Sequence, residues 1–255
     1  MTRTARLIMF GIAGTAIAVA VILAVLVMPS FGGTHHPYRD HAVVSGVHHQ
    51  TANVVSSVNF DQRGLDTLGE ETILLASVMG VSVLLRQTED ETESDGQPRG
   101  RVLGASRLGG YVMLPVTLIV GFDVVAHGHL TPGGGFQGGV VLGTGLHLLY
   151  VAGTYDALEK VRPVTAFEWG EALGAAAFAC LGIAGVFVAG AFLVNLIPLG
   201  NFGDLFSSGT VPVLNGAVGV EVASGTMVLL SKFLEQVIKL RGPGEKAGAG
   251  EAATS

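Results

Sequence analysis

Acidic side chains interrupt several apolar stretches of this 255-residue sequence. Glu221 is the clearest case, because it lies at the centre of the apolar run 211–233. A carboxyl group inside a bilayer is costly and usually faces a helix-bundle interior, a water-filled cavity or a partner. Small or polar residues accompany it in the sequence: Asn215, Gly219, Ser224 and Gly225. This pattern indicates a carboxylate that accepts protons beside a hydrated path, or else a structural hydrogen bond to a neighbouring helix.

Asp123 and His147 leave similar alternatives open. Asp123 lies four residues before His127, so both occupy one helical face and could form a carboxylate–imidazole pair for protons or sodium. The alternative for Asp123 is an interfacial carboxylate in contact with water. His147 lies within the next apolar run, where an imidazole could relay protons or simply act as a hydrogen-bond partner.

Two further acidic pairs lie near the starts of apolar runs. Glu70 follows Thr67 by three residues, which is capping-box spacing and predicts a structural role for at least one member of the pair Glu70 and Glu71. Glu71 lies deeper in its run and could face a polar interior. Glu168 and Glu171 open a later run and suit the positive end of a helix, so we expect a structural role for them.

The sequence predicts no metal site, cofactor or catalytic residue. Five histidines precede residue 50, but their spacing matches no compact zinc pattern and no Cys accompanies them: His35, His36, His41, His48 and His49. The single Cys180 excludes an intrachain disulfide and is expected to pack as a small apolar residue. Phosphate-binding loops and nucleophile elbows are absent from the sequence, which indicates a protein that is not an enzyme. The net charge of -6 gives no sign of a nucleic-acid partner.

The composition predicts an all-α integral membrane protein. The mean hydropathy is +0.56, and 13% of the residues are charged, against about a quarter in soluble domains. Six stretches approach the roughly 20 residues needed to cross a bilayer: about 7–28, 68–85, 108–126, 136–152, 167–197 and 211–233. We expect the first stretch to be retained, because its apolar run is longer than a signal-peptide core.

The distribution of basic residues predicts the orientation. With the N-terminus in the cytoplasm, only Arg39 and Arg63 of the 14 Lys and Arg residues fall on the outer side. The positive-inside rule therefore predicts about six transmembrane helices with both termini cytoplasmic.

A glycine-rich segment joins the third and fourth stretches. It reads His127-Gly128-His129-Leu130-Thr131-Pro132-Gly133-Gly134-Gly135-Phe136. Glycine backbone can approach another chain closely, and irregular backbone at membrane depth is tolerated only where protein or water satisfies it. The segment therefore predicts a packed joint between two helices.

This joint and a later stretch resemble the MnhB domain, the B subunit of Mrp-type multisubunit sodium/proton antiporters, over about residues 109–236. The matching residues are Gly128, His129, Pro132, Gly133, Gly134, Gly135, Phe136 and Gly139, then Leu214, Asn215, Val218, Gly219, Glu221, Val222 and Gly225. Residues 59–70 resemble the end of the large A-type component of these antiporters, or the E-type subunit of hydrogenase relatives. The resemblance implies a two-helix segment 1–86, a charged cytoplasmic linker 87–107 and a four-helix domain 108–240; composition predicts a disordered tail 241–255.

The resemblance implies a subunit rather than a self-sufficient transporter. Its partners would be large A- and D-type and small membrane subunits in a prokaryotic cell membrane, and its ions would be sodium and protons. By resemblance the functional motif is His129, Pro132, Gly133, Gly134, Gly135 and Phe136. Our candidates for the ion path are Glu221, Asp123, Glu70, Glu71 and His147. The alternatives are a membrane-arm subunit of a hydrogenase-related redox complex and a purely structural scaffold subunit.

Overall fold

The computed structural model of the chain describes residues 3–28, 32–34, 36–86, 103–152 and 164–240. Within these ranges the backbone forms eight α-helices, one π-helix and no strand, which confirms the expected all-α class. The chain divides into two compact units, residues 1–41 and 42–255, called unit 1 and unit 2 below. Most of the predicted linker and the whole predicted tail lie outside the described residues.

Unit 1 consists mainly of helix α1 (Arg3–Val27). Its segment Leu7–Val27 has a mean hydropathy of 2.7, and none of the residues in its most apolar window is buried within the chain. A helix that is apolar on all sides suits a lipid environment. Helix α2 (Pro37–His48) begins in unit 1 and continues into unit 2.

Five helices of the described ranges are long and apolar enough to cross a membrane. They are α1, α4 (Gly64–Leu84), α5 (Gly104–Ala126), α8 (Val164–Ala189) and α9 (Val211–Leu240). The fourth predicted stretch forms the 18-residue helix α6 (Gly135–Ala152). The chain is therefore a membrane protein, while six crossings and cytoplasmic termini stay predictions.

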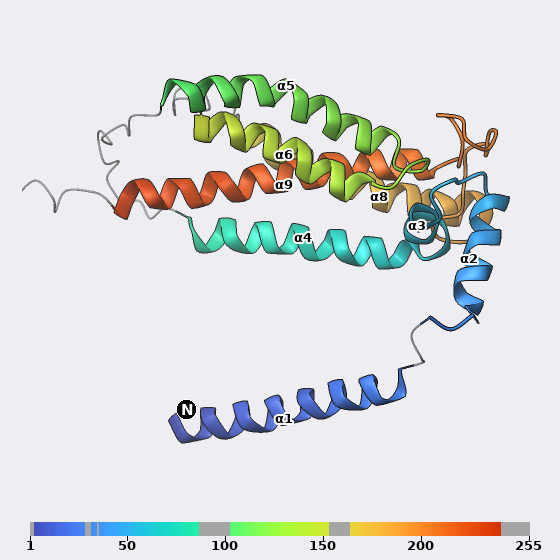
Figure 1. The fold of residues 1–255 in the computed structure, drawn as a ribbon, viewed down its shortest axis with the longest axis horizontal. Helices are drawn as coiled ribbons and strands as arrows, with labels where there is room; N and C mark the ends of the chain where they lie inside the picture. The colour runs from blue at the N-terminus through green and yellow to red at the C-terminus, as the bar shows by residue number, and fades with distance from the viewer. Residues whose placement is uncertain (1–2, 29–31, 35, 87–102, 153–163, 241–255) are drawn as a thin grey trace, which may run out of the picture. The chain divides into compact units, whose positions relative to one another are not determined.

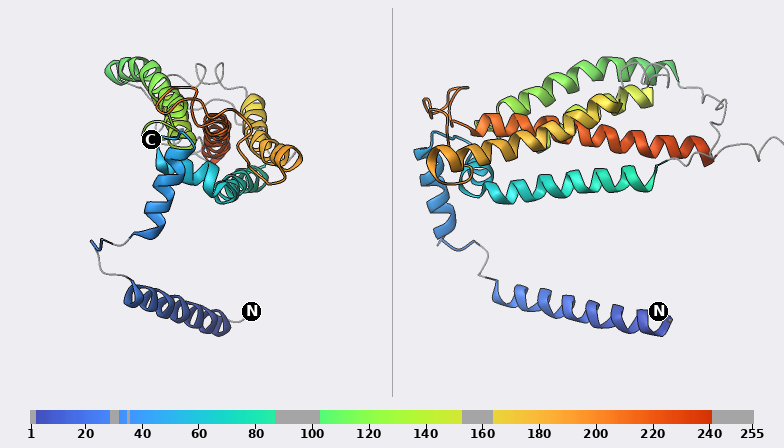
Figure 2. Two further views of the ribbon diagram at one scale, coloured as in Figure 1. Left: turned by 90° about the vertical axis from the view of Figure 1, so that its right-hand side faces the viewer. Right: turned by 180° about the vertical axis from the view of Figure 1, so that it is seen from behind.

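Helix α9 is the centre of unit 2. It contacts α4, α5, α6 and α8, and the end-on view shows it surrounded by them (Figures 1 and 2). In its most apolar window 56% of the residues are buried, against 11–22% in α4, α5 and α8. A polar side chain on α9 therefore tends to face protein, whereas one on the other helices tends to face the surroundings of the chain.

The segment before α4 is helical rather than irregular. Asn53 caps α3 (Val54–Ser57) by accepting from the Val55 and Ser56 N–H groups, and the π-helix η1 (Val58–Gln62) follows. Helix α4 then begins at Gly64, so Thr67 lies inside its first turn and donates to the Asn59 carbonyl oxygen at 2.7 Å. The predicted capping box of Thr67 and Glu70 is therefore wrong.

The fifth predicted stretch, 167–197, is not one helix. Helix α8 ends at Ala189, and Gly190 at φ 78° takes the left-handed conformation that commonly terminates a helix. The chain then folds back, so that the Leu193 N–H donates to the Gly182 carbonyl oxygen at 3.3 Å. Phe192 packs partly buried against the core cluster, to which Leu193 belongs. The apolar character of residues 190–197 thus reflects packing of a loop rather than a longer crossing.

Candidate functional site

Three buried carboxyl groups converge in the interior of unit 2. Glu71 of α4, Glu171 of α8 and Glu221 of α9 are 1%, 4% and 0% exposed. Five of their six carboxyl oxygens are enclosed and have no hydrogen-bond partner among the described residues. Glu71 lies close enough to Glu221 for their charges to interact, and Glu221 interacts in the same way with Glu171. We call these three residues the carboxylate cluster.

Glycines bring the helices of the cluster into close contact. A Cβ atom placed on Gly174 of α8 would lie 2.7 Å from the Cβ atom of Glu221, and one on Gly225 of α9 would lie 3.2 Å from Oε1 of Glu171. Glu221 and Glu171 therefore each pack against a glycine of the opposite helix. Small residues allow this close approach between membrane helices.

Glu171 departs from the expectation of a helix-terminus role. Helix α8 begins at Val164, so Glu171 lies beyond the first turn, where the effect of the helix dipole has largely decayed. Glu168, three residues earlier, is exposed and lies outside the interior of the bundle. The signal for Glu171 was present in the sequence, because the buried residues of α8 recur every three or four positions: Glu171, Gly174, Phe178, Gly182 and Gly185.

The other candidate acids lie at the surface of unit 2. Glu70 is exposed although it is adjacent to Glu71. Asp123 pairs with His127, with Oδ1 and Nδ1 2.9 Å apart, and its side chain is 66% exposed. The structure therefore brings Glu71 together with Glu221 but leaves Glu70 and Asp123 outside this cluster.

His147 and Cys180 are less buried than the carboxylate cluster. His147 of α6 is half-buried, and its enclosed Nε2 atom has no hydrogen-bond partner among the described residues. Cys180 is exposed on α8 rather than packed in the core.

The glycine joint, which the sequence predicts to be a packed joint between two helices, packs on α9. Gly133 and Gly134 adopt φ angles of 142° and 141°, which side chains rarely tolerate. The buried Asn215 accepts the Gly135 N–H at 2.9 Å and donates to Ser56 Oγ at 3.1 Å. One amide side chain therefore holds the joint, α9 and α3 together.

Asn53 connects the joint to the segment before α4. Its amide nitrogen donates to the carbonyl oxygens of Gly128 and Thr131, both at 2.8 Å, and its N–H donates to the His129 carbonyl oxygen at 2.9 Å. Sequence patterns offer no reason to single out Asn53, because its partners lie 75 and 78 residues away.

His129 and the apolar end of the motif complete the joint. The His129 side chain is fully buried, and its ring nitrogens lack a well-formed hydrogen bond among the described residues. Burial lowers the pKa of His129 below 6.5 and outweighs the opposing effect of the nearby Asp204 and Leu205 backbone. Phe136 packs partly buried against the core cluster, while Pro132 is exposed.

Sequence comparison places these features in a family. Residues 106–228 match the family described as a domain related to the MnhB subunit of Na+/H+ antiporter. The uncharacterized protein MJ1307 of Methanocaldococcus jannaschii is 30% identical over 221 residues, which cover 76% of this chain and 78% of that protein. A probable K(+)/H(+) antiporter A/B subunit of Rhizobium meliloti is 30% identical over 139 residues, which cover 46% of this chain but 14% of that protein.

Two solved structures share the fold. One is a chain of the membrane-bound sulfane sulfur reductase, an archaeal respiratory membrane complex, with 28% identity, a TM-score of 0.70 and coverage of 90% of this chain and 98% of that chain. The other belongs to the Mrp complex from Dietzia sp. DQ12-45-1b, with 25% identity, a TM-score of 0.65 and coverage of 91% of this chain and 26% of that chain. Both structures are multisubunit membrane complexes. This chain belongs to the family of membrane subunits that contain the MnhB-related domain of Na+/H+ antiporters.

Proposed function

We propose that this chain is a membrane subunit of a multisubunit antiporter that exchanges a monovalent cation for protons, and that the carboxylate cluster lies in or beside the ion path. The observation that carries this proposal is the set of five enclosed carboxyl oxygens on Glu71, Glu171 and Glu221, for which the described part of the chain provides no hydrogen-bond partner. Ionisable groups buried in a membrane bundle mark ion or proton pathways when no internal partner explains them.

The chemistry of the cluster suits exchange. A carboxylate without a partner in a dry interior is costly, and binding either a proton or a cation removes that cost. Because both species use the same oxygens, occupation by one excludes the other. Three such groups on three helices provide neighbouring positions between which a proton or cation can move.

The remaining candidates would connect the carboxylate cluster with the surface. Asp123 of α5 and His147 of α6 would bind protons or cations along this part of the path. Glu70 is exposed beside the buried Glu71, so a path that includes Glu70 would run along the border with a partner subunit. We propose large A- and D-type subunits and small membrane subunits as partners, in a prokaryotic cell membrane with both termini cytoplasmic. We favour sodium as the cation, with potassium as the comparison ion because one relative is a probable K(+)/H(+) antiporter subunit.

The test is Glu221→Gln in the complete complex purified from native membranes and reconstituted into vesicles. Cation-dependent proton movement should be lost because the amide cannot exchange a proton for a cation, while the partner subunits still co-purify. The matched control is Glu168→Gln, an exposed change on α8 that should leave exchange unchanged. Normal exchange by assembled Glu221→Gln complexes would refute the proposed role. Loss of assembly instead of transport would favour the scaffold role.

The membrane arm of a redox complex is the second candidate. It is favoured by the match to the sulfane sulfur reductase structure, in which this fold accounts for nearly the whole matched chain. The chain would then serve a complex with an electron-transfer module. Purification of the native complex decides between the two: iron–sulfur absorption and electron paramagnetic resonance signals that co-purify with this chain would favour the redox complex, and their absence from an intact, transporting complex would exclude it.

A further inference from the structure

A pocket lies among the loops of unit 2, at the end that holds the glycine joint. It has a volume of about 430 Å³. Its lining combines polar and apolar groups: His49, Asp61, Asn195, Phe192, Leu193 and Leu199. None of the residues of the carboxylate cluster lines it. The positive-inside rule predicts that this end of unit 2 faces the outside of the cell.

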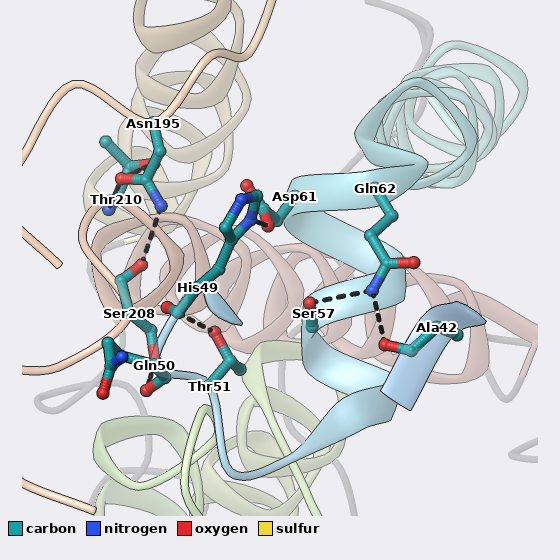
Figure 3. A network of polar contacts seen from close by, with 10 residues as sticks. All are labelled: Ala42, His49, Gln50, Thr51, Ser57, Asp61, Gln62, Asn195, Ser208 and Thr210. Carbon is teal, nitrogen blue, oxygen red and sulfur yellow. Dashed lines mark hydrogen bonds and ion pairs between the residues drawn. The ribbon is translucent and has the colours of Figure 1, made fainter. Parts of the chain in front are cut away.

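Asp61 is the acidic group of the pocket lining. It lies in η1, its side chain is 7% exposed, and it is paired with Nδ1 of the half-exposed His49 (Figure 3). Gln62 fixes η1 by donating to the carbonyl oxygen of Ala42 at 3.1 Å and to Ser57 Oγ at 3.0 Å. The carboxylate is therefore held in place at the pocket, where it pairs with the imidazole of His49.

The polar atoms of Asn195 are already occupied. Its Oδ1 atom accepts the Thr210 N–H at 2.7 Å, and its Nδ2 atom donates to the Ser208 carbonyl oxygen at 3.1 Å (Figure 3). Ser208 in turn donates to the Gln50 carbonyl oxygen at 3.0 Å. This wall of the pocket is thus fixed, which leaves Asp61 and His49 as the side chains that can respond to a charged ligand.

The pocket adjoins the face of α4 that leads to the carboxylate cluster. Leu193 lines the pocket, and a Cβ atom on Gly64 would lie 2.6 Å from its Cδ1 atom. Gly64, Thr67 and Glu71 are buried on the same side of α4. Seven residues of helix correspond to roughly 10 Å, so Glu71 lies about two turns below the wall of the pocket.

We propose that this pocket is an access site at which a monovalent cation from the aqueous phase binds Asp61 before it reaches Glu71. His49 is the competing partner of the carboxylate, so an arriving cation replaces the imidazole. This inference rests on the proposed antiport function and adds a separate site to it. It predicts that loss of the Asp61 carboxylate weakens cation binding, whereas loss of the His49 imidazole strengthens it.

The test measures exchange by the reconstituted complex against sodium chloride or potassium chloride, whichever supports proton movement. Asp61→Asn should raise the apparent KM for the cation by roughly 3- to 10-fold, because one charged contact is lost, with little change in the maximal rate. His49→Asn should lower the apparent KM, because the carboxylate is released. Asp204→Asn is the control, since this exposed carboxylate lies in the same loop but outside the pocket lining.

A second measurement covers the case in which Asp61→Asn impairs folding. Leu199→Cys is introduced into a Cys180→Ala background, and a membrane-impermeant thiol reagent is added from the outside. Modification should inhibit exchange and should slow when the transported cation is present. Phe202→Cys, exposed in the same loop, should be modified without inhibition.

An unchanged KM in both pair variants, or modification of Leu199→Cys without inhibition, would overturn the access site. Glu221→Gln would then still block exchange. That result would refute the access site alone and leave the proposed function standing.

Discussion

Helix α9 carries two buried polar regions that differ in how their polar atoms are satisfied. Asn215 is fully buried, and its amide bonds Gly135, Ser56 and the Val211 carbonyl oxygen. Glu221, six residues later, is also fully buried, but neither of its carboxyl oxygens has a partner among the described residues. The helix, the depth of burial and the glycine-rich surroundings are similar, so the contrast lies in the hydrogen bonds.

The difference in hydrogen bonding fits a structural role for Asn215 and the proposed ion-path role for Glu221. A buried polar group with every bond made contributes roughly 1 kcal/mol per hydrogen bond and costs more when one partner is removed. A buried carboxyl group with no partner destabilises the fold, and this cost is relieved under our proposal that Glu221 binds a proton or a cation during exchange. The following variants test this distinction by stability, which does not depend on a transport assay.

The largest loss of stability is expected for Gly135→Val. The new Cβ atom would lie 2.5 Å from the Asn215 carbonyl oxygen and 2.6 Å from the Val218 Cβ atom. Because α6 must then move away from α9 and break the bond to Asn215, we expect a cost of roughly 3 kcal/mol or more in the free energy of unfolding. Titration of the purified chain with denaturing detergent measures it. Gly216→Val is the control, since no atom lies within 4 Å of its Cβ position, and it should remain close to wild type.

A smaller loss is expected for Asn215→Leu. The Gly135 N–H and Ser56 hydroxyl lose their partner in a buried position, at a cost of about 1–3 kcal/mol. The comparison variant is Asn201→Leu, which removes an exposed bond to Asp204 and should change stability by less than about 0.5 kcal/mol. Equal stability of the two variants would show that the amide does not hold the joint.

His129 should make stability depend on pH. Burial lowers the pKa of His129 in the folded protein below its usual 6.5, so the unfolded chain binds a proton more readily. This contribution to stability is fully present above pH 6.5 and declines as the pH falls below 6.5. The unfolding midpoint measured across this range should decline less steeply in His129→Gln than in wild type. An identical decline in both proteins would contradict the prediction.

The smallest effect is expected for Glu171→Gln. Its enclosed Oε1 atom has no hydrogen-bond partner to lose within the described ranges, so the amide should leave the free energy of unfolding within about 0.5 kcal/mol of wild type or raise it. The same detergent titration applies. A loss as large as that of Asn215→Leu would mean that the carboxyl group has a structural partner, and the contrast between the two regions would fail.

Features that arise from the high cost of an unsatisfied polar group in lipid are predictable from the sequence. That cost predicts burial of Glu221 and close packing at Gly133, Gly134 and Gly135, and it leaves an interior position for Glu71 as one of two alternatives. The error at residues 190–197 has a physical cause: apolar composition does not distinguish a helix from a loop packed against the core. Gly190 was the available signal for the end of α8.

Other parts depended on contacts that sequence spacing does not reveal. Glu171 was assigned to a helix terminus because the start of α8 was placed three residues too late, at Phe167 instead of Val164. The contacts of Asn53 join it to residues 75 and 78 positions away, and those of Asp61 join η1 to His49. A propensity or a periodicity describes one element at a time, whereas these residues act between elements.

The bonds from Asn53 to Gly128 and Thr131 have a consequence for how such a protein can be encoded. They join the segment before α4 to the α5–α6 connection without using the peptide chain between them, and α4 also packs on α8 and α9. Cleavage within residues 87–102 would leave both fragments associated. One gene or two could therefore produce the same bundle, and a single gene fixes the ratio of the two parts at one to one.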